Sequence, residues 1–273
     1  MGVKKAVEAA EEALKENAQT RSATVYTLGP LIHNPTVLAD LESRGLQVLS
    51  SEDIPHIAKN SVVVIRAHGT TPKVVDGLKG MGANVVDATC PRVHLSQKRA
   101  AEWSAQGYDI VIAGDKNHGE VTSISAFAQG RVTVVQTSGE ARSLELAEKS
   151  VLIAQTTFSP SEFEKISSLL KAKNPALVVF NSICPATMKR QLALQDLQGK
   201  VDGIVVIGGR VSANTRRLYE TANKIAAHAA LIETADEIPD EFYSLATVGI
   251  SAGASTPENV IRSVEERLLS HAK

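Results

Sequence analysis

The sequence repeats one pattern of strands and helices three times, and this internal repeat limits the folds that the chain can adopt. Each repeat has a strand with a polar loop (LIHNP, KNHGEV, RVSANT) and a later strand that ends in a Thr/Ser-Pro turn (AHGTTP, AQTTFSP, AGASTP). The spacing agrees between repeats, because His118 follows Cys90 by 28 residues and Ser212 follows Cys184 by 28 residues. A repeat of this length indicates similar supersecondary units that share one architecture.

Two further strands end in Cys-Pro. NVVDATCP (84–91) and LVVFNSICP (177–185) hold the only two cysteines of the chain, Cys90 and Cys184. Short β-branched runs favour a strand, and proline suits the first position of a helix. Each thiol is therefore expected at a helix start, where the thiolate form is favoured. The alternative is that each cysteine is a small buried hydrophobic residue.

The composition excludes several classes of protein. Of the 273 residues, 43% are hydrophobic and 22% charged, which is ordinary for a globular chain. The net charge of −1 argues against a nucleic-acid surface made by excess Lys and Arg. No secretory signal and no apolar run of about 18 residues can be read, so we expect a cytoplasmic protein that does not enter a membrane.

Alternating strands and helices predict the α/β class with parallel sheets and right-handed crossovers. We expect three small α/β domains, related by pseudo-threefold symmetry and arranged as a trefoil around a central cavity. The predicted units are 1–89 (without its first strand), 90–183 and 184–260, followed by the end of a C-terminal helix, 261–273.

Polar residues gather at the carboxyl ends of the predicted strands, where ligands bind in parallel sheets. They are His33, His68, Cys90, His118, Thr156, Cys184, Ser212, Asn214 and Ser255. Several stand beside helix starts and suit a small diphosphate, although His, Ser and Thr in loops also serve as caps and turn formers. Glu120 is a candidate proton donor, or else a solvated carboxylate.

The cysteines favour an iron–sulfur cluster over zinc. Zinc sites with paired cysteines usually show close C-x-x-C spacing, which the chain lacks. A 4Fe–4S cluster accepts thiolates from distant segments and can leave one iron open to a substrate oxygen. Two thiolates alone would hold such a cluster poorly.

Eight motifs in order carry a resemblance to a known family: LIHNP, RAHGTTP, DATCPRV, NHGEV, QTTFS, SICPAT, SANT and AGASTP. Together they resemble the 4-hydroxy-3-methylbut-2-enyl diphosphate reductase (LytB) family, the last enzymes of the methylerythritol phosphate route to isoprenoids. The resemblance implies reductive removal of an allylic hydroxyl, which gives isopentenyl and dimethylallyl diphosphate. It also implies an oxygen-sensitive 4Fe–4S cluster and a ferredoxin or flavodoxin as the electron donor.

The resemblance also implies roles for individual residues. Cys90 and Cys184 look like cluster ligands, and Glu120 looks like the proton donor, with Thr156 close to the departing hydroxyl. The residues that resemble the substrate-binding groups of the family are His33, His68, His118, Thr156, Ser212, Asn214 and Ser255.

The chain departs from the family pattern in two places. Ala213 replaces the second serine of a serine-serine-asparagine stretch, and the chain starts at Met1-Gly2-Val3, where the family has a strand ending in Gly-Phe-Cys shortly before Gly-Val. We therefore expect a third cluster cysteine just upstream of Met1, and an unpaired sheet edge in the first unit of the chain as given. Two alternatives stay open: a cluster-free relative that binds a diphosphate without reducing it, and a Cys/His zinc hydrolase.

Overall fold

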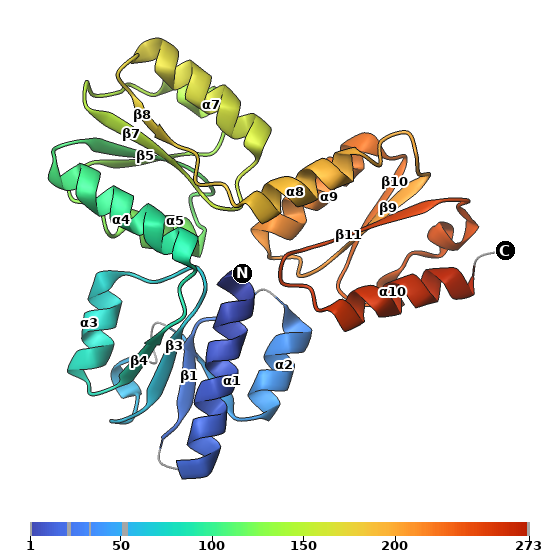
Figure 1. Ribbon diagram of the computed structural model, residues 1–273, viewed down its shortest axis with the longest axis horizontal. Helices are drawn as coiled ribbons and strands as arrows, with labels where there is room; N and C mark the ends of the chain where they lie inside the picture. Colours follow the sequence, from blue (N-terminus) through green and yellow to red (C-terminus); the bar gives the residue numbers. More distant parts are fainter. Residues whose placement is uncertain (1, 21–22, 33, 51–53, 272–273) are drawn as a thin grey trace. The chain divides into compact units, whose positions relative to one another are not determined.

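The computed structural model describes residues 2–20, 23–32, 34–50 and 54–271. In this part of the chain, helices alternate with the strands of three separate sheets, and every strand pair is parallel (Figure 1). The predicted α/β class with parallel sheets is therefore confirmed. Among these residues no helix is both long and apolar enough to cross a membrane.

The first sheet has the strand order β2-β1-β3-β4. Its strands are short and rich in Val and Leu, as expected for parallel strands that are covered on both faces. The strands are β1 (Val25–Leu28), β2 (Leu46–Leu49), β3 (Val62–Ile65) and β4 (Asn84–Asp87). The accompanying helices are α1 (Gly2–Thr20), α2 (Pro35–Ser43), the 3₁₀ turn η1 (Ile54–His56) and α3 (Pro72–Gly80).

The second sheet repeats this order as β6-β5-β7-β8. Its strands are β5 (Asp109–Ala113), β6 (Val132–Val135), β7 (Ser150–Ala154) and β8 (Val178–Phe180). Its helices are α4 (Pro91–Ala105), α5 (Gly119–Ser125), α6 (Ser138–Ser143) and α7 (Pro160–Lys173). The agreement between the two sheets follows from the sequence repeat.

The third sheet has the order β10-β9-β11. Its strands are β9 (Gly203–Ile207), β10 (His228–Ile232) and β11 (Val248–Ala252). Its helices are α8 (Pro185–Gln195), α9 (Ala213–Ile225), the 3₁₀ turns η2 (Ala235–Glu237) and η3 (Asp240–Ser244), and α10 (Glu258–Ser270).

The expected unpaired edge in the first unit is wrong. Among the described residues, the first sheet has four strands, like the second, and the sheet with three is the third. The reason lies in how the Cys-Pro strands pair. β4 pairs with β3 and β8 pairs with β7, so each strand before a Cys-Pro turn completes the sheet that precedes it in the chain. Such a strand does not open the next sheet.

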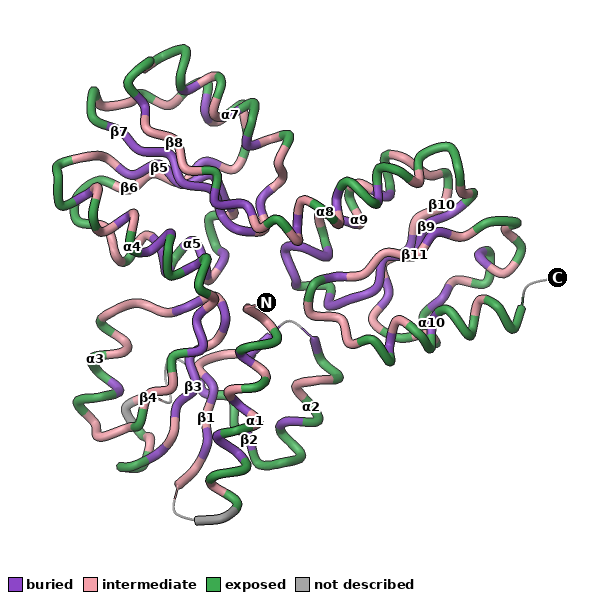
Figure 2. The backbone as a smooth tube through the Cα atoms, in the orientation of Figure 1, coloured by how far each residue is buried: buried purple, intermediate pink, exposed green. Residues whose placement is uncertain are grey.

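The core of the third sheet explains the uninterrupted apolar run of β9. In β9, Val205 and Ile207 pack with Val264 of α10, whereas Ile204 and Val206 pack with Leu218 of α9. Figure 1 shows α10 on one face of this sheet and α8 with α9 on the other, and Figure 2 shows the buried strand between them. With both faces covered, every residue of the strand is apolar, without alternation.

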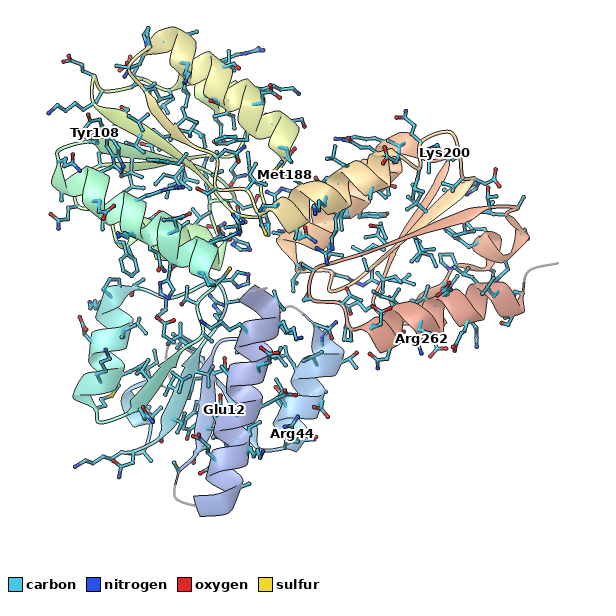
Figure 3. The ribbon with its side chains drawn as sticks, in the orientation of Figure 1. Glu12, Arg44, Tyr108, Met188, Lys200 and Arg262 are labelled. Carbon is cyan, nitrogen blue, oxygen red and sulfur yellow. The ribbon has the colours of Figure 1, made fainter. Side chains whose placement is uncertain are left out.

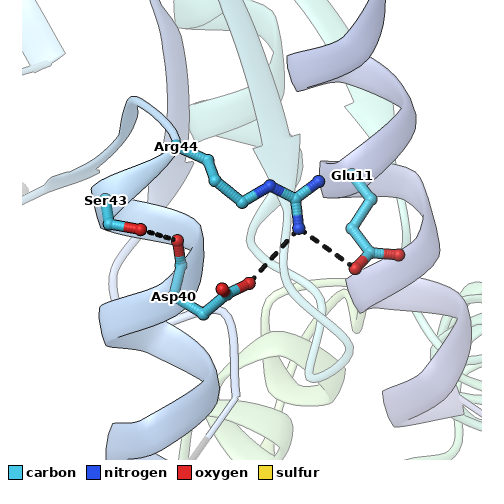
Figure 4. A network of polar contacts seen from close by, with 4 residues as sticks. All are labelled: Glu11, Asp40, Ser43 and Arg44. Atoms are coloured by element: carbon cyan, nitrogen blue, oxygen red, sulfur yellow. Dashed lines mark hydrogen bonds and ion pairs between the residues drawn. The ribbon is translucent and has the colours of Figure 1, made fainter.

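Charged side chains cover the outer surfaces of the helices, as Arg262 on α10 shows in Figure 3. On the surface of the first sheet, Arg44 joins two helices (Figure 4). Its Nη1 lies 3.3 Å from Glu11 Oε1 of α1 and 3.2 Å from Asp40 Oδ2 of α2. Exposed pairs of this kind contribute little to stability.

The chain divides into two compact units. One comprises Met1–Ile32 and Asp40–Ile183 with the first two sheets, and the other comprises His33–Ala39 and Cys184–Lys273 with the third sheet. The domain boundaries at 89/90, 183/184 and 260/261 stay predictions.

Candidate functional site

Both cysteines stand at helix starts, as their Cys-Pro motifs predict. Cys90 is the N-cap of α4 and Cys184 is the N-cap of α8, each followed by proline in the first turn. Neither thiol makes a side-chain capping hydrogen bond, whereas Ser159 at the start of α7 does. Both cysteines are free and half-buried. Each thiol is therefore left available to bind something other than its own helix.

The start of α1 lies directly against Cys90. A side-chain carbon built on Gly2 would stand 2.5 Å from Cys90 Sγ, which is closer than such carbons approach any atom. Glycine is therefore required here by close contact. The N-termini of α1 and α4, which carry partial positive charge, both lie beside this sulfur.

The loops after β3 and β5 bring two of the predicted histidines together. The rings of His68 and His118 meet edge to face, with centroids 4.8 Å apart. His118 is also the N-cap of α5, where its Nδ1 accepts a hydrogen bond from the backbone N–H of Glu120 at 3.2 Å. Cys90 joins the same strand ends, because its N–H donates to the carbonyl oxygen of Ala67, next to His68, at 3.0 Å.

Glu120 and Thr156 form the closest contact among the predicted residues. The backbone N–H of Thr156 donates to Glu120 Oε1 at 2.6 Å, and its hydroxyl lies 2.7 Å from Oε2. Glu120 is only 1% exposed, so it is a buried carboxyl group. A buried carboxyl group in direct contact with a hydroxyl can hold a proton and pass it to that hydroxyl.

In the second unit, the predicted residues lie at the ends of β9 and β11. Ser212 is the N-cap of α9, and its hydroxyl accepts from the N–H of Thr215 at 3.4 Å. Asn214 follows in the first turn and is buried, yet neither Oδ1 nor Nδ2 has a hydrogen-bond partner. Ser255 is half-buried in the loop before α10. Buried amides without partners are rare, and they point to a ligand that supplies the missing bonds.

The predicted residues thus fall into two groups. Within the first unit, the structure gathers five at adjoining strand ends: His68, Cys90, His118, Glu120 and Thr156. Within the second unit it holds Cys184, Ser212, Asn214 and Ser255. His33 and the expected upstream cysteine lie outside the described residues. In the described ranges, no three His, Cys, Asp or Glu side chains form a cluster that could hold a metal ion.

Sequence reasoning missed two residues beside this site. Arg66 directly follows β3 and is half-buried, with its guanidinium packed against Gly29 and Gly119. Burial lowers the pKa of this guanidinium below its usual value. Gln97 is buried beneath the loop that carries His68. The sequence could have indicated Arg66, because it stands directly before the AHGTTP motif. No neighbouring motif in the sequence indicates Gln97.

Comparisons with known proteins identify the family of the chain. The family model described as LytB protein matches residues 1–269. A relative from Treponema denticola, named 4-hydroxy-3-methylbut-2-enyl diphosphate reductase, is 45% identical over 98% of this chain and 95% of its own length. A relative of the same name from Caldanaerobacter subterraneus is 42% identical over 98% of this chain and 93% of its own length.

Solved structures give the same result. The E-1-hydroxy-2-methyl-but-2-enyl-4-diphosphate reductase of Plasmodium falciparum matches with a TM-score of 0.89 and 27% identity, over 97% of this chain and 83% of that one. A solved (E)-4-hydroxy-3-methyl-but-2-enyl diphosphate reductase matches with a TM-score of 0.69 and 37% identity, over 99% of this chain and 95% of that one. The resemblance carried by the eight motifs is confirmed, and the chain belongs to the LytB family.

Proposed function

We propose that this chain catalyses the reductive dehydroxylation of 4-hydroxy-3-methylbut-2-enyl diphosphate to isopentenyl and dimethylallyl diphosphate, the final step of the methylerythritol phosphate pathway. The reaction takes up two electrons and two protons, breaks the allylic C–O bond, and releases the hydroxyl as water. Family membership supports the substrate and reaction. The buried contact between Glu120 and Thr156 is the observation in this chain that carries the proposal.

Glu120 is proposed as the proton donor, with Thr156 as the group that touches the departing hydroxyl. A proton on Glu120 Oε2 lies within hydrogen-bond distance of the Thr156 hydroxyl. Thr156 can accept that proton while it donates its own to the leaving oxygen. The second hydrogen bond, from the Thr156 N–H to Oε1, fixes the rotation of the carboxyl group.

The diphosphate is proposed to bind neutral donors. They are His33, His68, His118, Ser212, Asn214 and Ser255. The unpartnered amide of Asn214 supports this assignment, because its buried Nδ2 can donate to a phosphate oxygen. Ser212 stands at the N-terminus of a 13-residue helix, where backbone N–H groups and the helix dipole favour an anion.

Cys90 and Cys184 are proposed as ligands of a 4Fe–4S cluster. Their free thiols, which make no capping hydrogen bonds, fit this role. When bound, the cluster supplies electrons to the substrate.

We further propose that a ferredoxin or flavodoxin delivers the electrons. A reduced redox partner and free thiols belong in the reducing cytoplasm, where the chain is proposed to act.

The test is an anaerobic assay after reconstitution with iron and sulfide, with dithionite and methyl viologen as reductant and both products measured by mass spectrometry. We expect turnover by the wild type and a loss of at least about 100-fold in Glu120→Gln, which cannot donate a proton. The exposed Glu145→Gln is the control and keeps full activity.

Other outcomes would contradict the proposal. Iron-free protein that binds pyrophosphate without turnover would indicate the cluster-free relative, and bound zinc with hydrolytic activity would indicate the zinc hydrolase. Full activity in Glu120→Gln would remove Glu120 from the mechanism.

A further inference from the structure

We infer that four hydrogen-bonded side chains, Asp87, His94, Gln97 and Ser123, position Glu120 for catalysis. The inference rests on the proposed function and concerns how its proton donor is held in place. None of the four is proposed to touch substrate or cluster, so all are positioning residues. They lie together in the first unit, on β4, α4 and α5.

The four side chains form a continuous series. Asp87 Oδ2 lies 3.3 Å from His94 Nε2, and His94 Nδ1 lies 2.9 Å from Gln97 Oε1. Gln97 Nε2 then donates to Ser123 Oγ at 2.5 Å. Ser123 Oγ donates in turn to the backbone carbonyl oxygen of Thr70 at 3.3 Å.

From His94 to Thr70, the hydrogen bonds of the series run in one direction. Because Gln97 donates through Nε2, its Oε1 is the acceptor, and His94 Nδ1 must carry a proton. Hydrogen bonds that run in one direction polarise each other and strengthen the series.

Burial makes the inner half of the series costly to break. Gln97 is 2% exposed and Ser123 is 1% exposed. Gly69 covers them with a φ of +74°, and a side-chain carbon there would stand 2.6 Å from Gln97 Nε2 and 2.7 Å from Ser123 Oγ. The loop that carries His68 can therefore close over this hydrogen bond only with glycine at position 69.

The series joins three segments of the candidate site. Ser123 lies one turn after Glu120 on α5 and therefore shares its face of the helix. Thr70 belongs to the loop of His68. Asp87 Oδ1 accepts the N–H of Thr89 at 2.9 Å and so shapes the turn that presents Cys90. A change at His94 is thus transmitted to the helix that holds Glu120.

The experiment replaces His94 in two ways. Leucine removes the donor to Gln97, whereas the amide nitrogen of asparagine can take the place of Nδ1. We expect His94→Leu to lower kcat about tenfold, in line with the effect of small misplacements of catalytic groups, with KM within about twofold of wild type. His94→Asn should restore most of kcat.

The matched control is His228→Leu. His228 also faces a carboxylate, with Nδ1 3.5 Å from Glu241 Oε1, and its side chain is 42% exposed against 48% for His94. It lies in the second unit, whereas the four residues lie in the first. We expect His228→Leu to leave kcat unchanged. This result would show that the loss of a half-exposed histidine beside a carboxylate does not by itself lower activity.

Hydrogen exchange provides a second measurement that does not depend on turnover. Amides of residues 120–125 should exchange faster in His94→Leu than in wild type or His228→Leu. The inference would be refuted if His94→Leu changed neither the amide exchange of residues 120–125 nor kcat. It would also be refuted if His94→Leu and His228→Leu lowered kcat equally. An inactive wild type with the expected exchange pattern would refute the proposed function and leave the series of hydrogen bonds supported.

Discussion

At the scale of single residues, the two cysteines occupy positions where a hydroxyl would stabilise the helix better. Cys184 has φ −66° and ψ 128°, and Ser159 has φ −67° and ψ 122°, so the two N-caps share one backbone conformation. The hydroxyl of Ser159 accepts from the N–H of Glu162, but the thiol of Cys184 caps nothing. The chain thus forgoes a helix cap at the position of a proposed cluster ligand.

Replacing Cys184 with serine should therefore separate stability from metal binding. In iron-free protein we expect Cys184→Ser to raise the free energy of unfolding by up to about 1 kcal/mol, the usual contribution of such a cap. Urea unfolding under anaerobic conditions measures this change. The same variant should bind less iron after reconstitution. A less stable iron-free variant, or one with full iron content, would contradict this assignment.

The sequence could identify these residues because their chemistry is local. A strand, a thiol and a proline are visible in a run of eight residues. The contact between Glu120 and Thr156 joins positions 36 residues apart, and only the family resemblance related the two, through the departing hydroxyl. No such relation indicates Gln97, because its role depends on the loop with Gly69 that the fold packs over it.

At the scale of elements, the hydrophobic pattern predicted which segments are strands but not which sheet each would join. The strand before each Cys-Pro turn reads the same whether it completes one sheet or begins the next. Its partner is chosen by the crossover that precedes it, as β4 and β8 both show. This is why the open edge was expected in the first unit when the sheet with three described strands is the third.

Helices α6 and α7 are joined through one carboxylate whose ionisation should be visible in stability. The N–H of Ser138 donates to Glu162 Oε1 at 2.6 Å, and this bond is the main reason that the pKa of Glu162 lies below its usual value. Because the folded state lowers this pKa, the ionised carboxylate stabilises the fold. The contribution is present above the unfolded pKa of about 4.3 and is lost as pH falls through the lower folded value.

We therefore expect Glu162→Gln to lower the free energy of unfolding by about 1 kcal/mol at pH 7, since the bond is charge-assisted but partly exposed to solvent. The difference from wild type should shrink steadily below about pH 4. Urea unfolding at several pH values measures it, with the exposed Glu164→Gln on the same helix as control. A difference that stays constant down to pH 3 would show that the charge is irrelevant.

At the scale of the whole molecule, the threefold repeat made the fold predictable. Each sheet follows the same order around its first strand, with β1, β5 and β9 each next to the two strands that follow. The repeat places the carboxyl ends of equivalent strands in equivalent loops, so the candidate residues could be found by alignment of the chain with itself. Self-comparison could reveal the series from Asp87 to Ser123 only in part. Gln97 has a counterpart in Gln191, whose Oε1 accepts from the Thr221 hydroxyl at 2.9 Å, whereas Met188 stands at the position that corresponds to His94.

Ligand binding should be measurable as a change in the stability of the whole chain, because a ligand that binds only the folded state stabilises it by mass action. Pyrophosphate at 100 times its dissociation constant should raise the free energy of unfolding of wild type by about 2.7 kcal/mol. Asn214→Ala should lose most of this gain. Without pyrophosphate the variant should be at least as stable as wild type, because it removes two buried polar atoms that have no partner.

Asn174→Ala is the opposite control for this measurement. The Asn174 side chain donates to the carbonyl oxygens of Ala147 at 3.1 Å and Glu148 at 2.9 Å, and it accepts from the N–H of Ala176 at 3.0 Å. Its loss should destabilise the chain by about 1–3 kcal/mol while the gain from pyrophosphate stays complete. Thermal unfolding of the three proteins with and without pyrophosphate gives both quantities. If Asn214→Ala lost stability and kept the full gain, the buried amide would be a structural group and not a ligand for phosphate.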